Sequence, residues 1–202
     1  MPVDSWDSPG EKIGHVAHID LGNEIPGIRG LFEYRPDTGA VLSDLGEVLL
    51  RGDSTLPRGE RELIAAYVSK LNDCSFCTDS HAAFAAAQLP EGMVLVDQVR
   101  SDPDAAEVSA KMRALLRIAA AVQRGGKNVQ DSDVVAAHEA GATDLEIHDT
   151  VLIAAAFCLY NRYVDGLATT LPDDPAGYAQ MAELIVSTGY GAASGQPVTQ
   201  GA

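Results

Sequence analysis

The sequence has few basic residues and no long apolar run. Its 202 residues include 14 Lys and Arg against 29 Asp and Glu, which gives a formal net charge of −15. Nucleic acids and anionic membranes are bound through clustered Lys and Arg, so this charge argues against both as the main partner. The longest apolar run, residues 151–160, is about half of the roughly 20 residues that a membrane-spanning helix needs. We therefore expect a soluble globular protein without a nucleic-acid or membrane partner.

Cysteine is scarce, and a secretory leader is not evident. The three cysteines are too few and too clustered for the disulfide framework of an extracellular domain. The first residues, MPVDSWDSPGEK, do not show the basic-then-apolar order of a signal peptide. We therefore expect a cytoplasmic protein, in which a Cys-x-x-Cys pair is more often catalytic or metal-binding than a structural staple.

Strand patterning is also missing, since no segment alternates apolar and polar residues for more than a few positions. Apolar residues instead recur at spacings of three and four, which predicts an all-α fold. We expect an N-terminal arm over residues 1–35, a single helical domain over residues 36–188, and a disordered Gly/Ser/Gln-rich tail over residues 189–202. Helices are expected at residues 30–34, 39–50, 57–71, 74–88, 93–100, 104–124, 132–140, 143–170 and 176–187.

A short internal repeat lies within the helical region. The sequence Leu-Ile-Ala-Ala occurs at residues 63–66 and again at 152–155, and Asn72 recurs at the same offset as Asn161. Where the first copy has Cys74, the second has Tyr163. The repeat predicts a domain built on a duplicated helical hairpin, in which one copy kept the chemistry.

Residues 62–81 concentrate the groups that can carry chemistry. Glu62 precedes Cys74 by twelve residues, and Cys77 and His81 follow Cys74 by three and seven. If Asp73 caps a helix that starts at Cys74, backbone N–H groups and the helix dipole favour a thiolate there. Positions i, i+3 and i+7 share one helix face, so the imidazole should lie beside both sulfurs.

Glu62 belongs to the preceding helix, which should run antiparallel to the one with the cysteines. At about 1.5 Å per residue, Glu62 lies roughly 15 Å from the turn and His81 roughly 10 Å. Glu62 should therefore contact His81 before it contacts Cys74. We interpret the four residues as a redox dithiol with a Glu62–His81 proton relay.

Other readings of the cysteines are open. Zinc would need a fourth ligand beside Cys74, Cys77 and His81, haem attachment needs a histidine where Thr78 stands, and a thioredoxin-like fold needs a βαβ context. We therefore expect no metal and no cofactor, while two inert buried cysteines stay an alternative. Cys158 is expected to be a core residue.

Four further residues are expected to line a pocket or support the site. Phe76 separates the cysteines, and Tyr67 lies on the inward face of the preceding helix. Asn161 and Arg162 follow the longest apolar run. A buried arginine needs a carboxylate partner, and Asp165 or Glu62 would serve for Arg162.

The pattern of Glu62, Cys74-x-x-Cys77 and His81 resembles the alkylhydroperoxidase D-like, carboxymuconolactone decarboxylase-like superfamily, and is most similar to its peroxidase-related branch. The stretch from residue 54 to residue 66 and the pair at 161–162 are typical of that branch. The resemblance implies an all-helical fold with a duplicated hairpin, assembled as a homo-oligomer (a trimer or hexamer).

The resemblance also implies a peroxiredoxin-type activity. Cys77 would be the peroxidatic cysteine and Cys74 its resolving partner, with Glu62 and His81 as the proton relay. The substrate would be an organic hydroperoxide, and the reductant an external dithiol, in the family sometimes a lipoyl-bearing adaptor. The hydroperoxidase proper has a histidine directly before the second cysteine, and Phe76 stands there in this chain.

Two other functions remain as alternatives. One is a non-redox, decarboxylase-like enzyme in which Glu62 and His81 act as acid and base. The other is a binding protein whose Cys74–Cys77 pair switches its oligomeric state.

Overall fold

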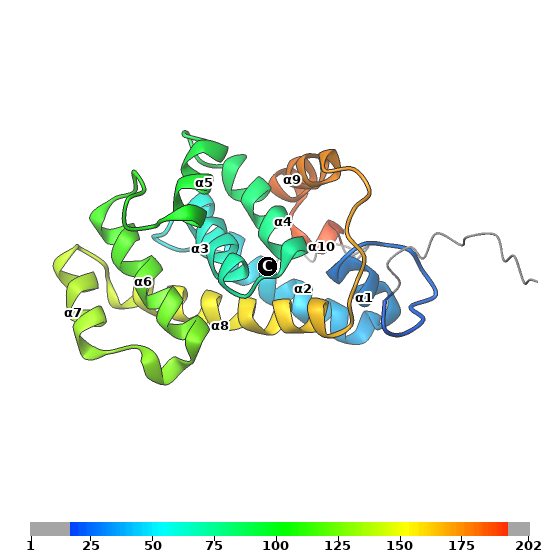
Figure 1. Ribbon diagram of the computed structural model, residues 1–202, viewed down its shortest axis with the longest axis horizontal. Helices are drawn as coiled ribbons and strands as arrows, with labels where there is room; N and C mark the ends of the chain where they lie inside the picture. The colour runs from blue at the N-terminus through cyan, green and yellow to red at the C-terminus, as the bar shows by residue number, and fades with distance from the viewer. Residues whose placement is uncertain (1–16, 194–202) are drawn as a thin grey trace, which may run out of the picture.

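The computed structural model describes residues 17–193, and all regular structure in this part of the chain is helical. The long helix α8 runs along one side of the molecule, with α6 and α7 near its start and α1 and α2 near its end (Figure 1). The all-α class predicted from the sequence is confirmed. The helices are α1 (Ile28–Tyr34), α2 (Pro36–Arg51), α3 (Arg58–Leu71), α4 (Ser75–Ala86), α5 (Met93–Ser101), α6 (Ala110–Arg124), α7 (Asp131–Glu139), α8 (Asp144–Gly166), α9 (Ala176–Thr188) and α10 (Tyr190–Ala193), with a 3₁₀ turn at Gly126–Asn128.

The core forms where α3 packs between α4, α6 and α8. Nearly every residue of α3 from Gly59 to Ser69 is buried, because this helix is covered on several sides. An apolar helix surrounded in this way is a core helix rather than an amphipathic surface helix. The helix that carries Glu62 is therefore the most enclosed part of the fold.

A polar clamp holds the turn between α3 and α4 against α8. The side-chain amide of Asn72 donates to Oδ1 of Asn161 at 2.8 Å, and Nδ2 of Asn161 donates to the Ser69 hydroxyl at 3.0 Å. The backbone N–H of Cys74 in turn donates to the carbonyl oxygen of Ser69 at 3.1 Å. Asn161 is thus a structural residue that fixes the start of α4 relative to α8. Asn72 and Asn161 are the equivalent positions of the predicted repeat.

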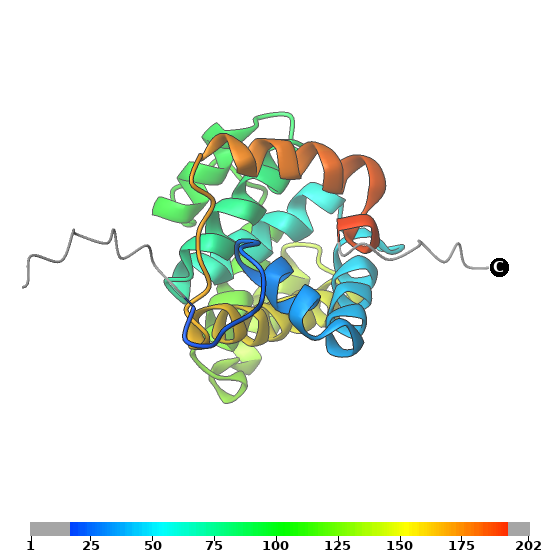
Figure 2. The same ribbon diagram turned by 90° about the vertical axis from the view of Figure 1, so that its right-hand side faces the viewer.

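The segment before α1 covers the turn that carries the cysteines. Its backbone is tied to the segment after α8 by hydrogen bonds from His18 N–H to the Leu167 carbonyl and from Gly27 N–H to the Thr170 carbonyl. Figure 2 shows these two segments side by side. Gly27 has a φ of 63°, and a Cβ at this position would lie 2.1 Å from the Phe76 ring. Only glycine permits this contact, so the arm lies directly on Phe76.

Of the predicted boundaries, three differ most from the structure. The helix expected from residue 104 begins at Ala110, because Asp102 holds a turn by accepting the N–H groups of Asp104 and Ala105 and Ser109 caps α6. The helix expected to reach residue 170 ends at Gly166, where Ala168 adopts a φ of 48°.

The C-terminal segment is the third difference. Residues 189–202 were expected to be disordered, but Tyr190–Ala193 form α10, and the Tyr190 side chain packs into the core between α2 and α9. Residues 194–202 and 1–16 lie outside the described part of the chain.

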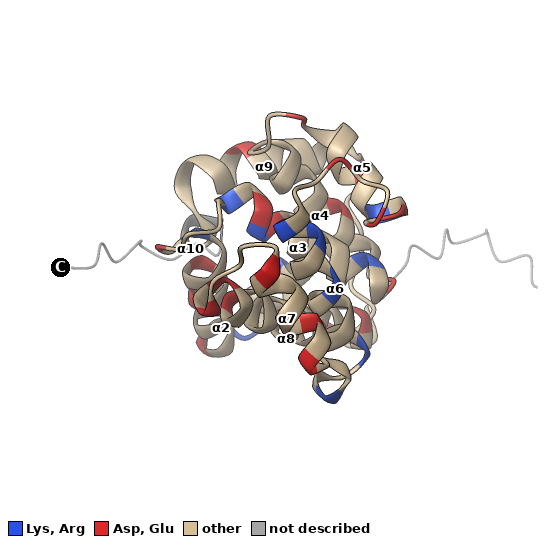
Figure 3. Ribbon diagram, turned by 90° about the vertical axis from the view of Figure 1, so that its left-hand side faces the viewer, with Lys and Arg blue, Asp and Glu red and all other residues tan. Residues whose placement is uncertain are grey.

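Two of the basic residues on α6 are paired with carboxylates. Lys111 lies 2.7 Å from Glu146 and Arg117 2.8 Å from Asp104, and the charges of both signs are interspersed around this helix (Figure 3). Among residues 17–193, no helix has the length and apolar character needed to span a bilayer.

The clamp predicts a measurable stability effect. Asn161→Ala removes both hydrogen bonds and leaves the buried Ser69 hydroxyl and the Asn72 amide without these partners, which should lower the free energy of unfolding by about 1–3 kcal/mol. Urea unfolding followed by circular dichroism measures the change. Asn128→Ala, at an exposed asparagine, is the matched control. Equal stability of the two variants would show that the clamp contributes nothing.

Candidate active site

A buried carboxylate is the centre of the site. Glu62 on α3 is 1% exposed, and its Oε2 lies 2.7 Å from Nδ1 of His81 on α4. The Tyr190 hydroxyl on α10 donates to the other carboxylate oxygen at 2.6 Å. An ionised carboxylate only accepts hydrogen bonds, so Nδ1 then carries the proton and Nε2 is left as the basic nitrogen. The contact between Glu62 and His81 predicted from helix rise is confirmed.

Aromatic rings enclose the imidazole of His81. The Phe157 ring meets it edge-on at a centroid distance of 4.5 Å, and the Phe84 ring does so at 5.1 Å. The Tyr190 ring stacks at 6.3 Å. This enclosure fixes the plane of the imidazole and keeps water away from the Glu62–His81 pair, which strengthens their electrostatic interaction.

The two cysteines lie at the first turn of α4, both reduced. Cys74 is the N-cap residue, α4 starts at Ser75, and Asp73 adopts a left-handed φ of 57°. The expectation that Asp73 caps the helix is therefore wrong, since Cys74 itself takes that position. Cys74 is fully buried and Cys77 is 3% exposed, and Val164 of α8 packs against both.

The electrostatics of Cys74 oppose a thiolate there. A hydrogen bond to the Cys77 sulfur and burial raise the pKa of Cys74 well above its usual range, although the backbone N–H of Cys77 acts in the opposite direction. The prediction that the helix start stabilises a thiolate is therefore wrong for Cys74. Its sulfur is buried away from water, and its S–H group donates a hydrogen bond to Cys77.

A carboxyl from α8 also reaches Cys74. The Asp165 carboxyl lies near the Cys74 thiol and contributes to raising its pKa. Burial raises the pKa of Asp165, and the neighbouring Cys74 thiol lowers it in part. Asp165 follows Asn161 by one helical turn, so the clamp holds this carboxyl beside the cysteine pair.

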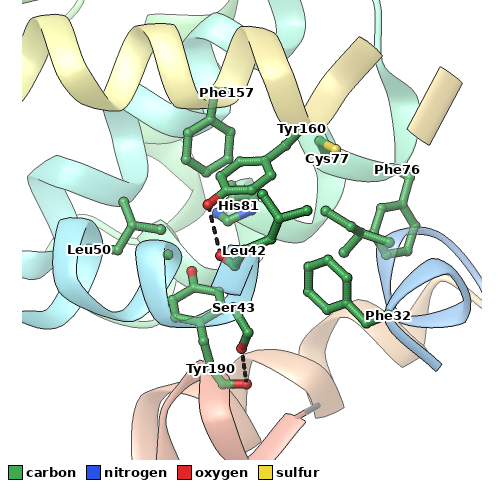
Figure 4. Close-up of a pocket in the computed structure, with 12 residues that line it drawn as sticks. Phe32, Leu42, Ser43, Leu50, Phe76, Cys77, His81, Phe157, Tyr160 and Tyr190 are labelled. Carbon is green, nitrogen blue, oxygen red and sulfur yellow. Dashed lines mark hydrogen bonds between the residues drawn. The ribbon is translucent and has the colours of Figure 1, made fainter. Parts of the chain in front are cut away.

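An apolar cavity of about 60 Å³ lies between α1, α2, α4, α8 and α10. Cys77 and His81 both line it, with Phe157, Tyr160 and Leu50 on the inner side (Figure 4). A second cavity of about 70 Å³ shares its Ile28, Phe32, Phe76 and His81 walls. Both are far smaller than the roughly 300–1,000 Å³ pockets that hold drug-sized ligands. Phe76 is a wall of both cavities, as expected from its sequence position.

The other predicted residues lie elsewhere. Tyr67 is a core residue outside both cavities, and burial raises its pKa. Arg162 is exposed and donates to the Cys158 carbonyl oxygen at 2.8 Å. The expected burial of Arg162 in an ion pair is therefore wrong. Cys158 is half-buried and packs on the core, and the Asn72 amide approaches its sulfur at 3.6 Å.

Sequence reasoning missed three contacts of the site. The Gly/Ser/Gln-rich composition predicts a disordered tail that includes Tyr190, although a lone aromatic between two glycines is a signal of packing. Phe157 was hidden in an apolar run, and Asp165 was considered only as a partner of Arg162. Within residues 17–193, no group of three His, Cys, Asp or Glu side chains is placed to hold a metal ion.

Comparisons with known proteins agree with this architecture. A profile of the carboxymuconolactone decarboxylase family matches residues 36–89 and 96–170. The structure is similar to that of a peroxidase-related protein from Ralstonia eutropha JMP134 described as an alkylhydroperoxidase AhpD core, with a TM-score of 0.70, 27% identity, and coverage of 78% of this chain and 81% of that one.

A peroxidase-related protein from Silicibacter sp. TM1040 has the same fold. The comparison gives a TM-score of 0.69 at 24% identity and covers 77% of this chain and 79% of that one. A search of curated protein sequences gave no significant match.

The Tyr190–Glu62 hydrogen bond predicts an alkaline stability effect. Burial and the charge of Glu62 raise the pKa of Tyr190, so its stabilising contribution is complete below the unfolded value of about 10 and is lost as pH rises above it. Urea unfolding at pH 8 to 11 should show a shallower alkaline loss for Tyr190→Phe than for the wild type. Tyr34→Phe, at an exposed ring, should keep the wild-type slope, and equal slopes for both variants would contradict the assignment.

Proposed function

This chain belongs to the carboxymuconolactone decarboxylase family, and from that premise we propose that it is a cofactor-free, peroxiredoxin-type dithiol peroxidase that reduces organic hydroperoxides. The observation that supports this most directly is that Cys77 and His81 line one apolar cavity while Glu62 holds His81 by a 2.7 Å contact. A nucleophile and a proton carrier thus border the same cavity, and a carboxylate orients the proton carrier.

The electrostatics favour Cys77 as the attacking cysteine. Cys74 donates a hydrogen bond to the Cys77 sulfur, and its own pKa is raised by that bond and by burial. Negative charge in the pair is therefore better placed on Cys77, which also borders the cavity. Cys74 then acts as the resolving cysteine.

The proposed cycle has two steps on the protein. Nε2 of His81 takes the proton of the Cys77 thiol, and the thiolate attacks the outer oxygen of the hydroperoxide. The O–O bond breaks, and His81 returns this proton to the departing alkoxide to give the alcohol. Cys77 becomes a sulfenic acid. Cys74 then attacks the Cys77 sulfur, the S–S bond forms, and the hydroxyl group leaves as water. Two electrons pass from the dithiol to the peroxide.

An external dithiol, such as a lipoyl group on an adaptor protein, would return the disulfide to the reduced state. Both sulfurs are buried, and the segment around Gly27 lies on Phe76 beside them. Reduction therefore needs this segment or Phe76 to move aside. We place the protein in the cytoplasm, where thiol reductants keep cysteines in the free state.

A second function is supported by the Glu62–His81 pair, whose contact does not involve either cysteine. A non-redox enzyme acting on a lactone or keto acid would use the pair as base and acid. Cys74→Ala combined with Cys77→Ala would leave such turnover intact, whereas Glu62→Gln would abolish it. The contact between the Cys74 and Cys77 thiols favours the redox function. A redox-switched oligomer is tested by sizing with and without dithiothreitol.

The peroxidase proposal predicts different phenotypes for the site residues. Cys77→Ser should abolish reduction of cumene hydroperoxide, and Cys74→Ser should allow one turnover that ends as a sulfenic acid. Glu62→Gln should slow peroxide reduction by about 10²-fold or more, because general acid–base groups contribute about 10²–10⁴-fold. Stopped-flow peroxide consumption by the reduced protein measures all three.

The control for these variants is Cys158→Ser, which removes a thiol outside the cavities and should keep the wild-type rate. Equally slow peroxide consumption by the wild type and Cys77→Ser would refute the peroxidase proposal.

We also propose that the chain forms a homo-oligomer, a trimer or hexamer, through an exposed apolar face of α8 and α2. Leu145, Leu152 and Leu159 of α8 are 52%, 39% and 48% exposed and follow one another at intervals of seven. Leu159 lines a surface hollow with Val41 of α2, which is 68% exposed. Apolar residues at this interval form the seam between packed helices, and contiguous exposed apolar surface marks association sites.

A charge in this face should prevent self-association. Leu159→Glu is expected to shift the protein to a smaller species in size-exclusion chromatography with light scattering, without unfolding it. Val94→Glu changes a valine on α5 that is 68% exposed and should leave the mass unchanged. An unchanged mass for Leu159→Glu would show that another surface, or none, makes the oligomer.

A further inference from the structure

The dithiol has proton-accepting groups on two sides. Glu62 and His81 lie on the side of the cavity and of Cys77, whereas Asp165 lies on the side of Cys74. Cys74 is not among the residues that line the cavity with His81. The relay that serves Cys77 therefore leaves the proton of Cys74 without an assigned acceptor.

A proton acceptor at Cys74 is needed for chemical reasons. Only the thiolate attacks sulfur at a useful rate, and the pKa of Cys74 is raised by its hydrogen bond to Cys77 and by burial. Phe76, which lies between the two cysteines, has no group that transfers protons. The resolving step therefore requires a base from outside α4.

A continuous framework holds the turn of α8 that carries Asp165 beside Cys74. The Cys74 N–H is tied to the Ser69 carbonyl, and the Ser69 hydroxyl is tied to Asn161 on α8. Asp165 lies one turn after Asn161, and the neighbouring Val164 packs against Cys74 and Cys77. Asp165 is also exposed, so it can exchange a proton with solvent.

We propose that Asp165 is the general base of the resolving step, an assignment that rests on the proposed dithiol function. The Asp165 carboxylate takes the proton of the Cys74 thiol as the sulfur attacks Cys77 in its sulfenic acid form. The S–S bond forms, the S–O bond breaks, and the departing hydroxide takes a proton from solvent and leaves as water. Asp165 then releases its proton to solvent. The two half-reactions thus use two separate carboxylates, Glu62 and Asp165.

The titratable groups around Cys74 come from three helices. Cys77 lies on α4, Asp165 on α8, and Tyr178 of α9 interacts electrostatically with both cysteines. Burial first, and then the charges of Asp79 and the cysteines, raise the pKa of Tyr178 to about 12. Tyr178 is therefore neutral when Asp165 acts, and Asp165 is the anionic member of the group.

The test compares Asp165→Asn with Asp165→Glu in a Cys158→Ala background, in which Cys74 and Cys77 are the remaining thiols. Single-turnover reaction with cumene hydroperoxide is followed by rapid quench, with dimedone trapping of the sulfenic acid and a thiol count for the disulfide. Asp165→Asn should slow disulfide formation at least tenfold at pH 7 while the first step stays within twofold. Its disulfide rate should rise steadily from pH 7 to pH 9, and Asp165→Glu should restore most of the wild-type rate. Asp173→Asn, at an exposed aspartate, is the matched control.

A second reaction separates this assignment from the peroxidase proposal. Ellman's reagent forms a mixed disulfide on one cysteine, and attack by the other releases a second aryl thiolate without any peroxide. If hydroperoxide is not consumed but Asp165→Asn slows this second release, the peroxidase proposal fails and the role of Asp165 stands. If hydroperoxide is consumed and Asp165→Asn forms the disulfide at the wild-type rate and pH profile, the role of Asp165 is overturned.

Discussion

The buried carboxylate of Glu62 is the constraint on which the site depends. A carboxylate removed from water must be paired and hydrogen-bonded, or it costs several kcal/mol. Here the imidazole of His81 satisfies one oxygen and the hydroxyl of Tyr190 the other. These partners come from α4 and α10. The Glu62 side chain, on the most enclosed helix, therefore holds both the imidazole of His81 and the C-terminal helix α10 in place. The same requirement explains why α10 packs against the core although it has only 4 residues.

The central pairing could be predicted because it depends on local geometry. Glu62 and His81 lie on two consecutive helices joined by a tight turn, and helix rise alone places Glu62 closer to His81 than to Cys74. The cysteines could be located for the same reason. Contacts made by distant segments could not be predicted, because nothing local specifies them. Tyr190 reaches Glu62 from 128 positions away, and Asp165 reaches Cys74 from another helix. The N-cap position of Cys74 was also missed, since Asp73 is a good cap by residue type but adopts a left-handed backbone conformation instead.

Burial gives the two cysteines different properties although they lie on one helical turn. Cys77 borders the cavity, whereas Cys74 is fully buried and its thiol donates a hydrogen bond to the Cys77 sulfur. The segment around Gly27 lies on Phe76 and shields the two cysteines from water. The two small cavities have room for a compact apolar group. In the proposed cycle, the same enclosure would require movement near Gly27 before a reductant could reach the Cys74–Cys77 disulfide. The different surroundings of the two cysteines are built on the scaffold shared by the carboxymuconolactone decarboxylase family.

The most direct test of the account is the fate of the thiols after one equivalent of hydroperoxide. Reduced protein is mixed with cumene hydroperoxide and analysed by intact mass, thiol count and peptide mapping. The account predicts the loss of two hydrogens and two thiols, a disulfide between Cys74 and Cys77, and an unchanged Cys158. Unchanged thiols, or oxygen added at Cys158 with the Cys74–Cys77 pair still reduced, would contradict it.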